Sequence, residues 1–203
     1  MKVITYKLLN ILKIPTLLRI LNTTPKVIFW HGVDIKHDPL VDSECVNCDV
    51  FEKQIKYLIK HFNIVSIDCL KLPYSLSKKD LIITFDDGFK NNLEIAAPIL
   101  KKYKIPFTVF ISTDNISSGS LFPTSISRLV ILKSNASKIN IPTLGVDEIL
   151  RTPDDRMLLS KYIESKLKTI PIDQVKKATK EIINNISIND YELLKNKYSS
   201  LIP

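Results

Sequence analysis

Short apolar runs of strand length alternate with amphipathic helical stretches through the first half of the chain. The runs cover residues 26–33, 64–70, 81–85 and 107–111, and they are rich in β-branched and aromatic residues. Between them, residues 51–62 and 91–103 place apolar side chains at helical spacing, and Pro98 within the second stretch predicts a kink. This order predicts β/α units around a parallel sheet, and therefore an α/β fold.

The pattern changes after Ser112. Residues 112–128 are rich in Ser, Thr, Asn and Gly, which predicts a long loop beyond the strand ends. Short apolar pieces follow at 129–132 and 139–141. From Asp147 onward the chain is rich in lysine and helical in period, with breaks expected at Pro153, at Pro171 and near Asn189. We expect no strong strand in this tail.

The N-terminal residues 1–25 have apolar side chains at near-helical spacing, broken by basic residues and by Pro15. The segment is too short and too charged for a spanning helix, which needs about 20 mainly apolar residues. It also lacks the features of a secretory signal, which favours the cytoplasm or the inner face of the membrane. Two interpretations stay open: a helix docked on the domain, which we favour, and a basic amphipathic helix over residues 1–24 on a membrane surface.

Composition removes several function classes. The net charge is +8, but the 29 Lys and Arg residues are spread along the chain, which favours solvated lysine faces over a nucleic-acid site. With 4 glycines, the chain has no glycine-rich phosphate-binding loop. The 3 cysteines indicate a reducing compartment, and Cys45-x-x-Cys48 lacks the second pair of a structural zinc site.

The most informative stretch is Leu81–Gly88, which reads LIITFDDG. Side chains alternate along a strand, so Asp86 and Asp87 share one pocket only if the pleat breaks, which Gly88 permits. Two adjacent carboxylates suit a divalent metal, with one as ligand and the other as base for a metal-bound water. The alternatives are an Asp-Gly hairpin turn, which the helical stripe after Gly88 disfavours, and two solvated aspartates capping that helix.

In this context TFDDG resembles the polysaccharide deacetylase family, also called the NodB-homology domain. The segment after it is similar as well, and reads NNLEIAAPILKKYKIPFTVFIST. So are three further pieces, FWHGV, FEKQIKYLIKHFNIVSID and SLFPTSISRL. The resemblance runs continuously over about residues 26–145, and several spaced features agree.

The resemblance implies a deformed (β/α) barrel and removal of N-acetyl groups from an N-acetylated oligo- or polysaccharide. It implies that Asp86 is the catalytic base and Asp87 a ligand of a divalent metal, zinc first, with nickel or cobalt as alternatives. His31 and Gly88 are then expected to line the substrate pocket, and we favour this role of His31 over a metal role.

The chain departs from the family pattern after the aspartates. The family takes two further metal ligands from a later H-[ST]-x-x-x-H motif, whereas the histidines here are His31, His37 and His61. We therefore expect residues 26–145 to form the N-terminal half of a barrel and residues 146–203 a helical insertion or tail. The missing half predicts a partner that supplies it, or a dimer.

Two other functions compete with a truncated deacetylase. One is a non-catalytic glycan-binding or partner-dependent domain that keeps the fold. The other is a receiver-like phospho-acceptor domain with magnesium at acidic strand ends. This last interpretation is the weakest, because it requires a lysine at a later strand end and FTVFIST has none.

Overall fold

A computed structural model describes residues 24–36, 38–71 and 76–203 of the chain. Apart from residues 24 and 25, the predicted N-terminal helix lies outside these ranges, as does His37. Within them, no helix is long and apolar enough to cross a membrane.

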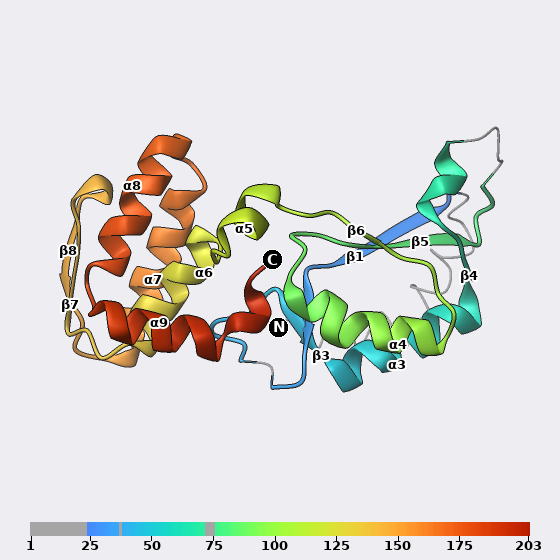
Figure 1. Ribbon diagram of the computed structural model, residues 1–203, viewed down its shortest axis with the longest axis horizontal. Helices are drawn as coiled ribbons and strands as arrows, with labels where there is room; N and C mark the ends of the chain where they lie inside the picture. The colour runs from blue at the N-terminus through green and yellow to red at the C-terminus, as the bar shows by residue number, and fades with distance from the viewer. Residues whose placement is uncertain (1–23, 37, 72–75) are drawn as a thin grey trace, which may run out of the picture.

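A four-stranded parallel sheet forms one end of the molecule (Figure 1). Its central strand is β5 (Asp80–Phe85), with β1 (Lys26–Trp30) along one edge in the register Ile28 to Ile83. The short strands β4 (Asn63–Ile64) and β6 (Thr108–Val109) pair with successive parts of β5. The Val65 and Phe110 N–H groups donate to the carbonyl oxygens of Leu81 and Phe85. The backbone N–H and C=O groups of every second residue point to the same edge of a strand. Both short strands therefore lie on the edge of β5 that faces away from β1.

Helices cover one face of this sheet. α3 (Cys48–His61) and α4 (Ala97–Lys102) lie against it, and their apolar stripes enclose a core with the odd-numbered side chains of β5 (Figure 1). This core includes Phe51, Ile55, Ile83, Phe85 and Leu100. Asn47 caps α3 by accepting from the Asp49 backbone N–H, which explains where the predicted helix begins.

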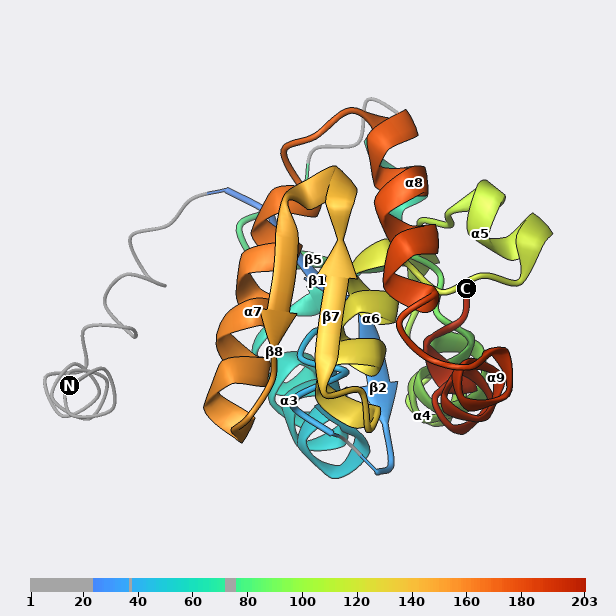
Figure 2. The ribbon, with the colours of Figure 1, turned by 90° about the vertical axis from the view of Figure 1, so that its left-hand side faces the viewer.

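The other end of the molecule is a helical lobe, formed by residues 113–201. It contains α5 (Thr113–Ser118), α6 (Pro123–Arg128), α7 (Pro153–Leu167), α8 (Ile172–Ile183) and α9 (Ile188–Lys197). The antiparallel hairpin of β7 (Lys138–Ile141) and β8 (Val146–Ile149) lies against α7 and α8 (Figure 2). A second core fills this lobe, with Leu129, Ile131, Ile139, Ile163 and Ile182 fully buried.

Several sequence predictions are confirmed. The first three apolar runs contain strands, and helices occupy 51–61 and 97–102 as expected. Pro98 lies in the first turn of α4, directly after a π-helical turn at Asn92–Ala96, so the predicted irregularity is present. In the tail, Pro153 begins α7 and Pro171 precedes α8, while the third break falls just before Asn189, where Ser187 caps α9.

The predicted loop over residues 112–128 is wrong. Two short helices occupy it, because Gly119 ends α5 at a φ of 60° and Pro123 provides the fixed φ that suits the first turn of α6. The tail also contains a strand that we did not expect, β8, which pairs with β7 through a turn at Gly145. The turn-forming residues Gly119 and Pro123 therefore lie at the ends of helices and not within a long loop.

Three predicted strands are much shorter than expected, and the run at 107–111 gives only β6. The run at 64–70 gives only β4, because Ser66 accepts from the Asp68 N–H and turns the chain into a 3-10 helix (Ile67–Leu70). The first run is interrupted at His31, after which β2 (Gly32–Asp34) pairs with a separate strand, β3 (Cys45–Asn47).

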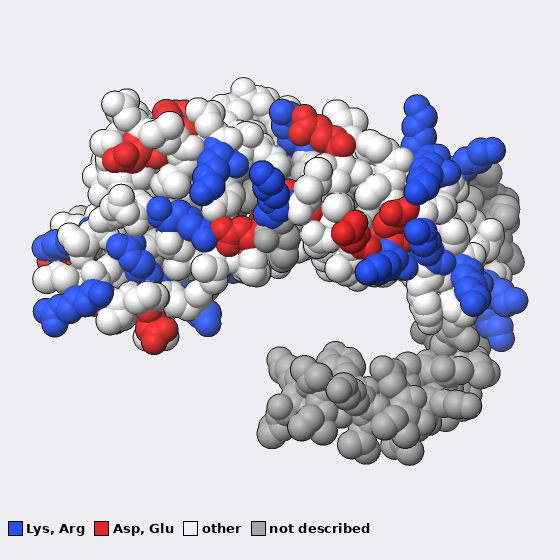
Figure 3. All heavy atoms as spheres, turned by 90° about the horizontal axis from the view of Figure 1, so that it is seen from below, with Lys and Arg blue, Asp and Glu red and all other residues white. Residues whose placement is uncertain are grey.

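The α/β class is confirmed, but the barrel is not. Across the described residues the sheets are small, and the edges of the four-stranded sheet do not meet. The predicted boundary between residues 145 and 146 stays a prediction. Lys and Arg side chains are interspersed with Asp and Glu over most of the face seen in Figure 3, whereas Lys and Arg predominate at its right-hand end.

Candidate functional site

His31 and Asp86 lie side by side where β1 and β5 end. The pair Trp30–Phe85 closes the strand register, and the Asp86 N–H donates to the Trp30 carbonyl at 3.0 Å, which extends the ladder by one residue. Because side chains alternate, both residues belong to the sheet face opposite α3 and α4. The Phe29 and His31 rings meet edge to face at 5.7 Å, which agrees with this placement.

Asp87 breaks the pleat immediately after Asp86. Its φ is 70°, and the Gly88 N–H donates back to the Asp86 carbonyl at 2.9 Å, forming a three-residue turn. Gly88 follows with a φ of 74°. We expected the glycine alone to permit the break, whereas the left-handed backbone already begins at the aspartate, where a side chain makes it costly.

We call the group formed by His31, Asp86 and Asp87 the aspartate corner. Burial raises the pKa of the Asp87 carboxyl above its ordinary value, and the charges of Asp86 and Glu44 add to this rise. The charge of His31 opposes it. His31 and Asp86 are therefore close enough to Asp87 for their charges to act on its carboxyl group.

Gly88 lies close to the chain that follows β6. A Cβ atom at Gly88 would come within 3.0 Å of the Ile111 Cγ2 atom and 3.2 Å of the Ile111 Cα atom. A glycine is therefore required both by the backbone conformation and by the lack of space.

The sequence analysis missed two residues that border the corner, Glu44 and Arg128. Glu44 Oε2 lies 3.8 Å from His31 Nδ1, and Glu44 Oε1 lies 3.3 Å from an Arg128 nitrogen. Glu44 lies between the predicted strand at 26–33 and the predicted helix at 51–62, and Arg128 lies at the end of the predicted loop at 112–128. In the sequence, Arg128 is a single arginine at the end of SLFPTSISR, and its position there does not indicate which residues it contacts.

The backbone just after His31 is held by tight packing. A Cβ atom on Gly32 would lie 2.5 Å from Cys45 Sγ and 2.8 Å from Asn91 Oδ1. Asn91 is fully buried and accepts from the Val33 N–H at 3.3 Å. Burial also raises the pKa of the Cys45 thiol to about 12, so this cysteine is a packing residue.

Residues 198–202, which we call the C-terminal strap, fasten the loops around the corner. Tyr198 donates to Asp38 at 2.8 Å, Ser200 donates to Asp34 at 2.9 Å, and the Lys90 N–H donates to the Ile202 carbonyl at 2.8 Å. Leu201 is buried between them. The strap therefore joins the loop after β2 to the segment just after Gly88.

The described residues do not bring together three His, Cys, Asp or Glu side chains that could hold a metal ion. His61 lies on α3, where its ring contacts that of Tyr57 at 4.4 Å. Cys45 is buried away from solvent, and Cys48 is the first residue of α3. Asp87 thus has no second and third ligand in this part of the chain.

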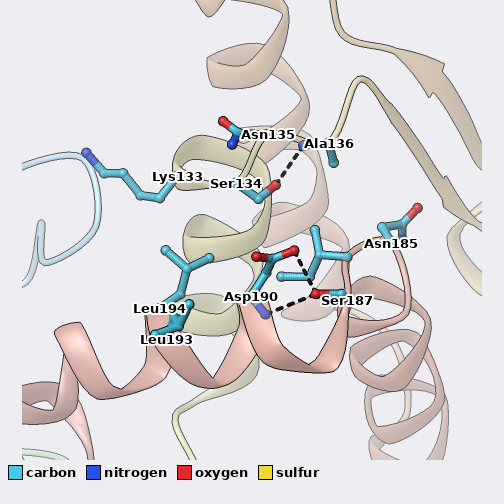
Figure 4. Close-up of a pocket in the computed structure, with 10 residues that line it drawn as sticks. Lys133, Ser134, Asn135, Ala136, Asn185, Ser187, Asp190, Leu193 and Leu194 are labelled. Atoms are coloured by element: carbon cyan, nitrogen blue, oxygen red, sulfur yellow. Dashed lines mark hydrogen bonds between the residues drawn. The ribbon is translucent and has the colours of Figure 1, made fainter.

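A pocket of about 470 Å³ lies in the helical lobe, away from the aspartate corner (Figure 4). It lies between residues 133–136 and the start of α9. Two polar residues of the pocket are hydrogen-bonded to each other. Ser187 caps α9 by accepting from the Asp190 N–H at 3.1 Å, and the Ser187 hydroxyl donates to the Asp190 carboxylate at 2.7 Å. We assign it no ligand.

The left-handed backbone at Asp87 gives a testable difference between two substitutions. We expect Asp87→Gly to be more stable to unfolding than Asp87→Ala by about 1 kcal/mol, because glycine adopts positive φ without a Cβ clash. Urea unfolding followed by circular dichroism measures the difference. At Asp114, inside α5, the order should reverse, since alanine favours a helix. An alanine variant at position 87 as stable as the glycine variant would contradict the strained turn.

Comparison with known proteins gives consistent matches. The family model described as polysaccharide deacetylase matches residues 74–139. Poly-beta-1,6-N-acetyl-D-glucosamine N-deacetylases of several Staphylococcus aureus strains are 31% identical over 150 residues. That alignment covers 72% of this chain and 47% of the relative, so the chain spans about half the length of the curated relatives it matches.

The solved structures to which this chain is similar are also described as deacetylases, but their structural similarity to it is low. A Streptococcus pyogenes deacetylase in complex with acetate is 20% identical, with a TM-score of 0.40. The match covers 81% of this chain and 82% of that deacetylase chain. A de-N-acetylase from Aggregatibacter actinomycetemcomitans is 17% identical, covers 70% and 51%, and has a TM-score of 0.35. We base nothing further on these two overlaps.

Proposed function

We propose that this chain, which is similar to polysaccharide deacetylases, carries one part of a hydrolase site that removes N-acetyl groups from a glycan. The observation that supports this most is the placement of His31 beside Asp86 at neighbouring strand ends, with Asp87 next in the chain. The names of the Staphylococcus aureus relatives suggest a polymer of N-acetylglucosamine as the substrate class.

Each residue of the corner has a proposed role. Asp86 is the base that takes a proton from the water attacking the acetamide carbonyl. The amide C–N bond then breaks as the leaving nitrogen takes up a proton from a general acid outside the corner, giving acetate and a free amine on the sugar. His31 and Gly88 line the substrate pocket, and Gly88 allows the backbone after the aspartates to pack closely against Ile111.

A divalent metal, zinc first, is expected from the family, and Asp87 is its proposed ligand. The described residues do not fit a complete site, because catalytic zinc normally has three protein ligands and no such set is present among them. We therefore derive no step through a metal. We propose that the open sheet is part of a deformed barrel, and that a partner or a second copy completes the ligand set.

The same incomplete ligand set favours a second candidate function. A domain that keeps the pocket but not the metal would bind an N-acetylated glycan without hydrolysing it. Val27 and Phe29, which are 62% and 56% exposed on the corner's face of the sheet, offer apolar surface for such binding.

Acetate release distinguishes these functions. The full chain is incubated with short N-acetylglucosamine oligomers, with and without added Zn²⁺, and acetate is measured alongside calorimetric binding. Acetate production supports the hydrolase, and binding without acetate supports the glycan-binding domain. Fully deacetylated oligomers are the control, because they should give no acetate and weaker binding. If the chain neither releases acetate nor binds the oligomers, both functions are rejected.

A further inference from the structure

A buried arginine connects the helical lobe to the aspartate corner. The Arg128 side chain, at the end of α6, is only 8% exposed. Its Nε atom donates to Glu164 Oε1 at 3.0 Å, and its terminal nitrogen donates to Glu164 Oε2 at 2.7 Å. This two-pronged contact with α7 fixes the plane of the guanidinium group.

The same guanidinium group holds Glu44. One terminal nitrogen donates to Glu44 Oε1 at 3.3 Å, and the other donates to the Val41 carbonyl at 3.4 Å. Glu44 therefore has one carboxylate oxygen on a fixed cation, while its other oxygen faces His31. A carboxylate held in this way has little freedom to turn away from the ring.

The ring of His31 is placed between two neighbours. The Nδ1 atom of His31 is 3.8 Å from Glu44 Oε2. The centroids of the His31 and Phe29 rings are 5.7 Å apart, with an angle of 73° between the ring planes. A carboxylate is an acceptor only, so the nitrogen facing it is the one favoured to carry a proton. The other ring nitrogen, Nε2, then has the lone pair.

We propose that Glu44, held by Arg128, is a positioning residue that keeps the proton of His31 on Nδ1 and leaves Nε2 as the acceptor nitrogen of the ring. This inference rests on the proposed function for its meaning, because a defined tautomer is needed to bind a substrate donor in one orientation. The placement itself follows from the contacts of Arg128, Glu44 and His31.

The separation of 3.8 Å is longer than a hydrogen bond, so an exposed ion pair without effect is the competing explanation. The two explanations differ in what they predict for the ring. An exposed pair would leave His31 in the tautomer mixture of a solvated histidine, whereas a positioning carboxylate shifts that mixture toward the Nδ1–H form.

Nitrogen-15 NMR of the histidine rings tests the proposal on the full chain. Spectra are recorded at about pH 9, so that neutral imidazole rings are compared. We expect His31 of the wild type to be mainly in the Nδ1–H form and Glu44→Leu to make it mainly Nε2–H. Glu44→Gln should shift the ring in the same direction as Glu44→Leu, because its amide oxygen accepts from Arg128 and its NH2 group, which only donates, then faces Nδ1. Glu148→Leu, an exposed glutamate on β8, is the matched control and should change nothing.

The outcomes are separable from enzyme activity. A wild-type His31 that is mainly Nε2–H, or a Glu44→Leu spectrum equal to the wild-type one, overturns the positioning role. The indole signal of Trp30 shows whether each variant is folded. A wild type with the expected tautomer but no acetate release would reject the proposed hydrolase and leave the role of Glu44 in place.

Discussion

Replacing Arg128 by methionine is expected to lower the free energy of unfolding by about 3 kcal/mol. The substitution removes the cation that Glu164 contacts through both carboxylate oxygens, and Glu164 is itself largely buried, with 19% of its side chain exposed. An unpaired carboxylate in that position loses its partner without regaining full hydration. Urea unfolding measures the loss, with circular dichroism reporting on the helical lobe and Trp30 fluorescence on the sheet.

A double variant provides the control for this prediction. In Arg128→Met with Glu164→Met, both charges are replaced by apolar side chains of similar length, so most of the lost stability should return. If the double variant is as unstable as Arg128→Met alone, then packing of the arginine stem, and not the unpaired carboxylate, explains the loss.

Asp86→Asn is expected to lower the rate of acetate release about 10²–10⁴-fold, which is the usual contribution of a general base. The amide has nearly the shape of the carboxylate but takes up no proton, so the fold and the ladder bond to Trp30 should remain. The measurement is kcat/KM on N-acetylglucosamine oligomers under conditions in which the wild type releases acetate.

Two comparisons sharpen the Asp86 result. Asp114→Asn changes an exposed aspartate on α5, outside the corner, and should leave the rate unchanged. Circular dichroism of Asp86→Asn should match the wild type. An Asp86→Asn protein that keeps more than half of the wild-type rate would remove Asp86 from the role of base.

Some of this architecture is readable from local sequence. The strand before Asp86 is a run of apolar side chains that suits a strand buried on both faces, and β5 is buried throughout. The helix over 51–61 has an apolar stripe and an asparagine cap, both of which are local signals. The β/α order predicts that His31 and Asp86 lie at the same end of a parallel sheet, but it does not predict that β1 pairs directly with β5, because β4 lies between them in sequence.

Other features depend on contacts between distant residues, so no local pattern reveals them. Glu44 gains its importance from Arg128, which lies 84 positions later in the chain. The helix at 123–128 is rich in Ser and Thr, whose weak helix propensity suggested a loop, but tertiary packing of Ile126 and its neighbours stabilises it. The helix at 113–118 has no buried residue, and Gly119 ends it.

The C-terminal strap has a consequence for the order of folding. Its bonds to Asp38 and Asp34 join residues 160 and 166 positions apart, so closing them carries a large loop entropy and comes after the sheet and helices have formed. During synthesis, the loops around His31 cannot be fastened until residues near 200 have left the ribosome. The chemistry-bearing end of the sheet is therefore expected to be the last region to become rigid, and hydrogen exchange at Lys90 should report that moment.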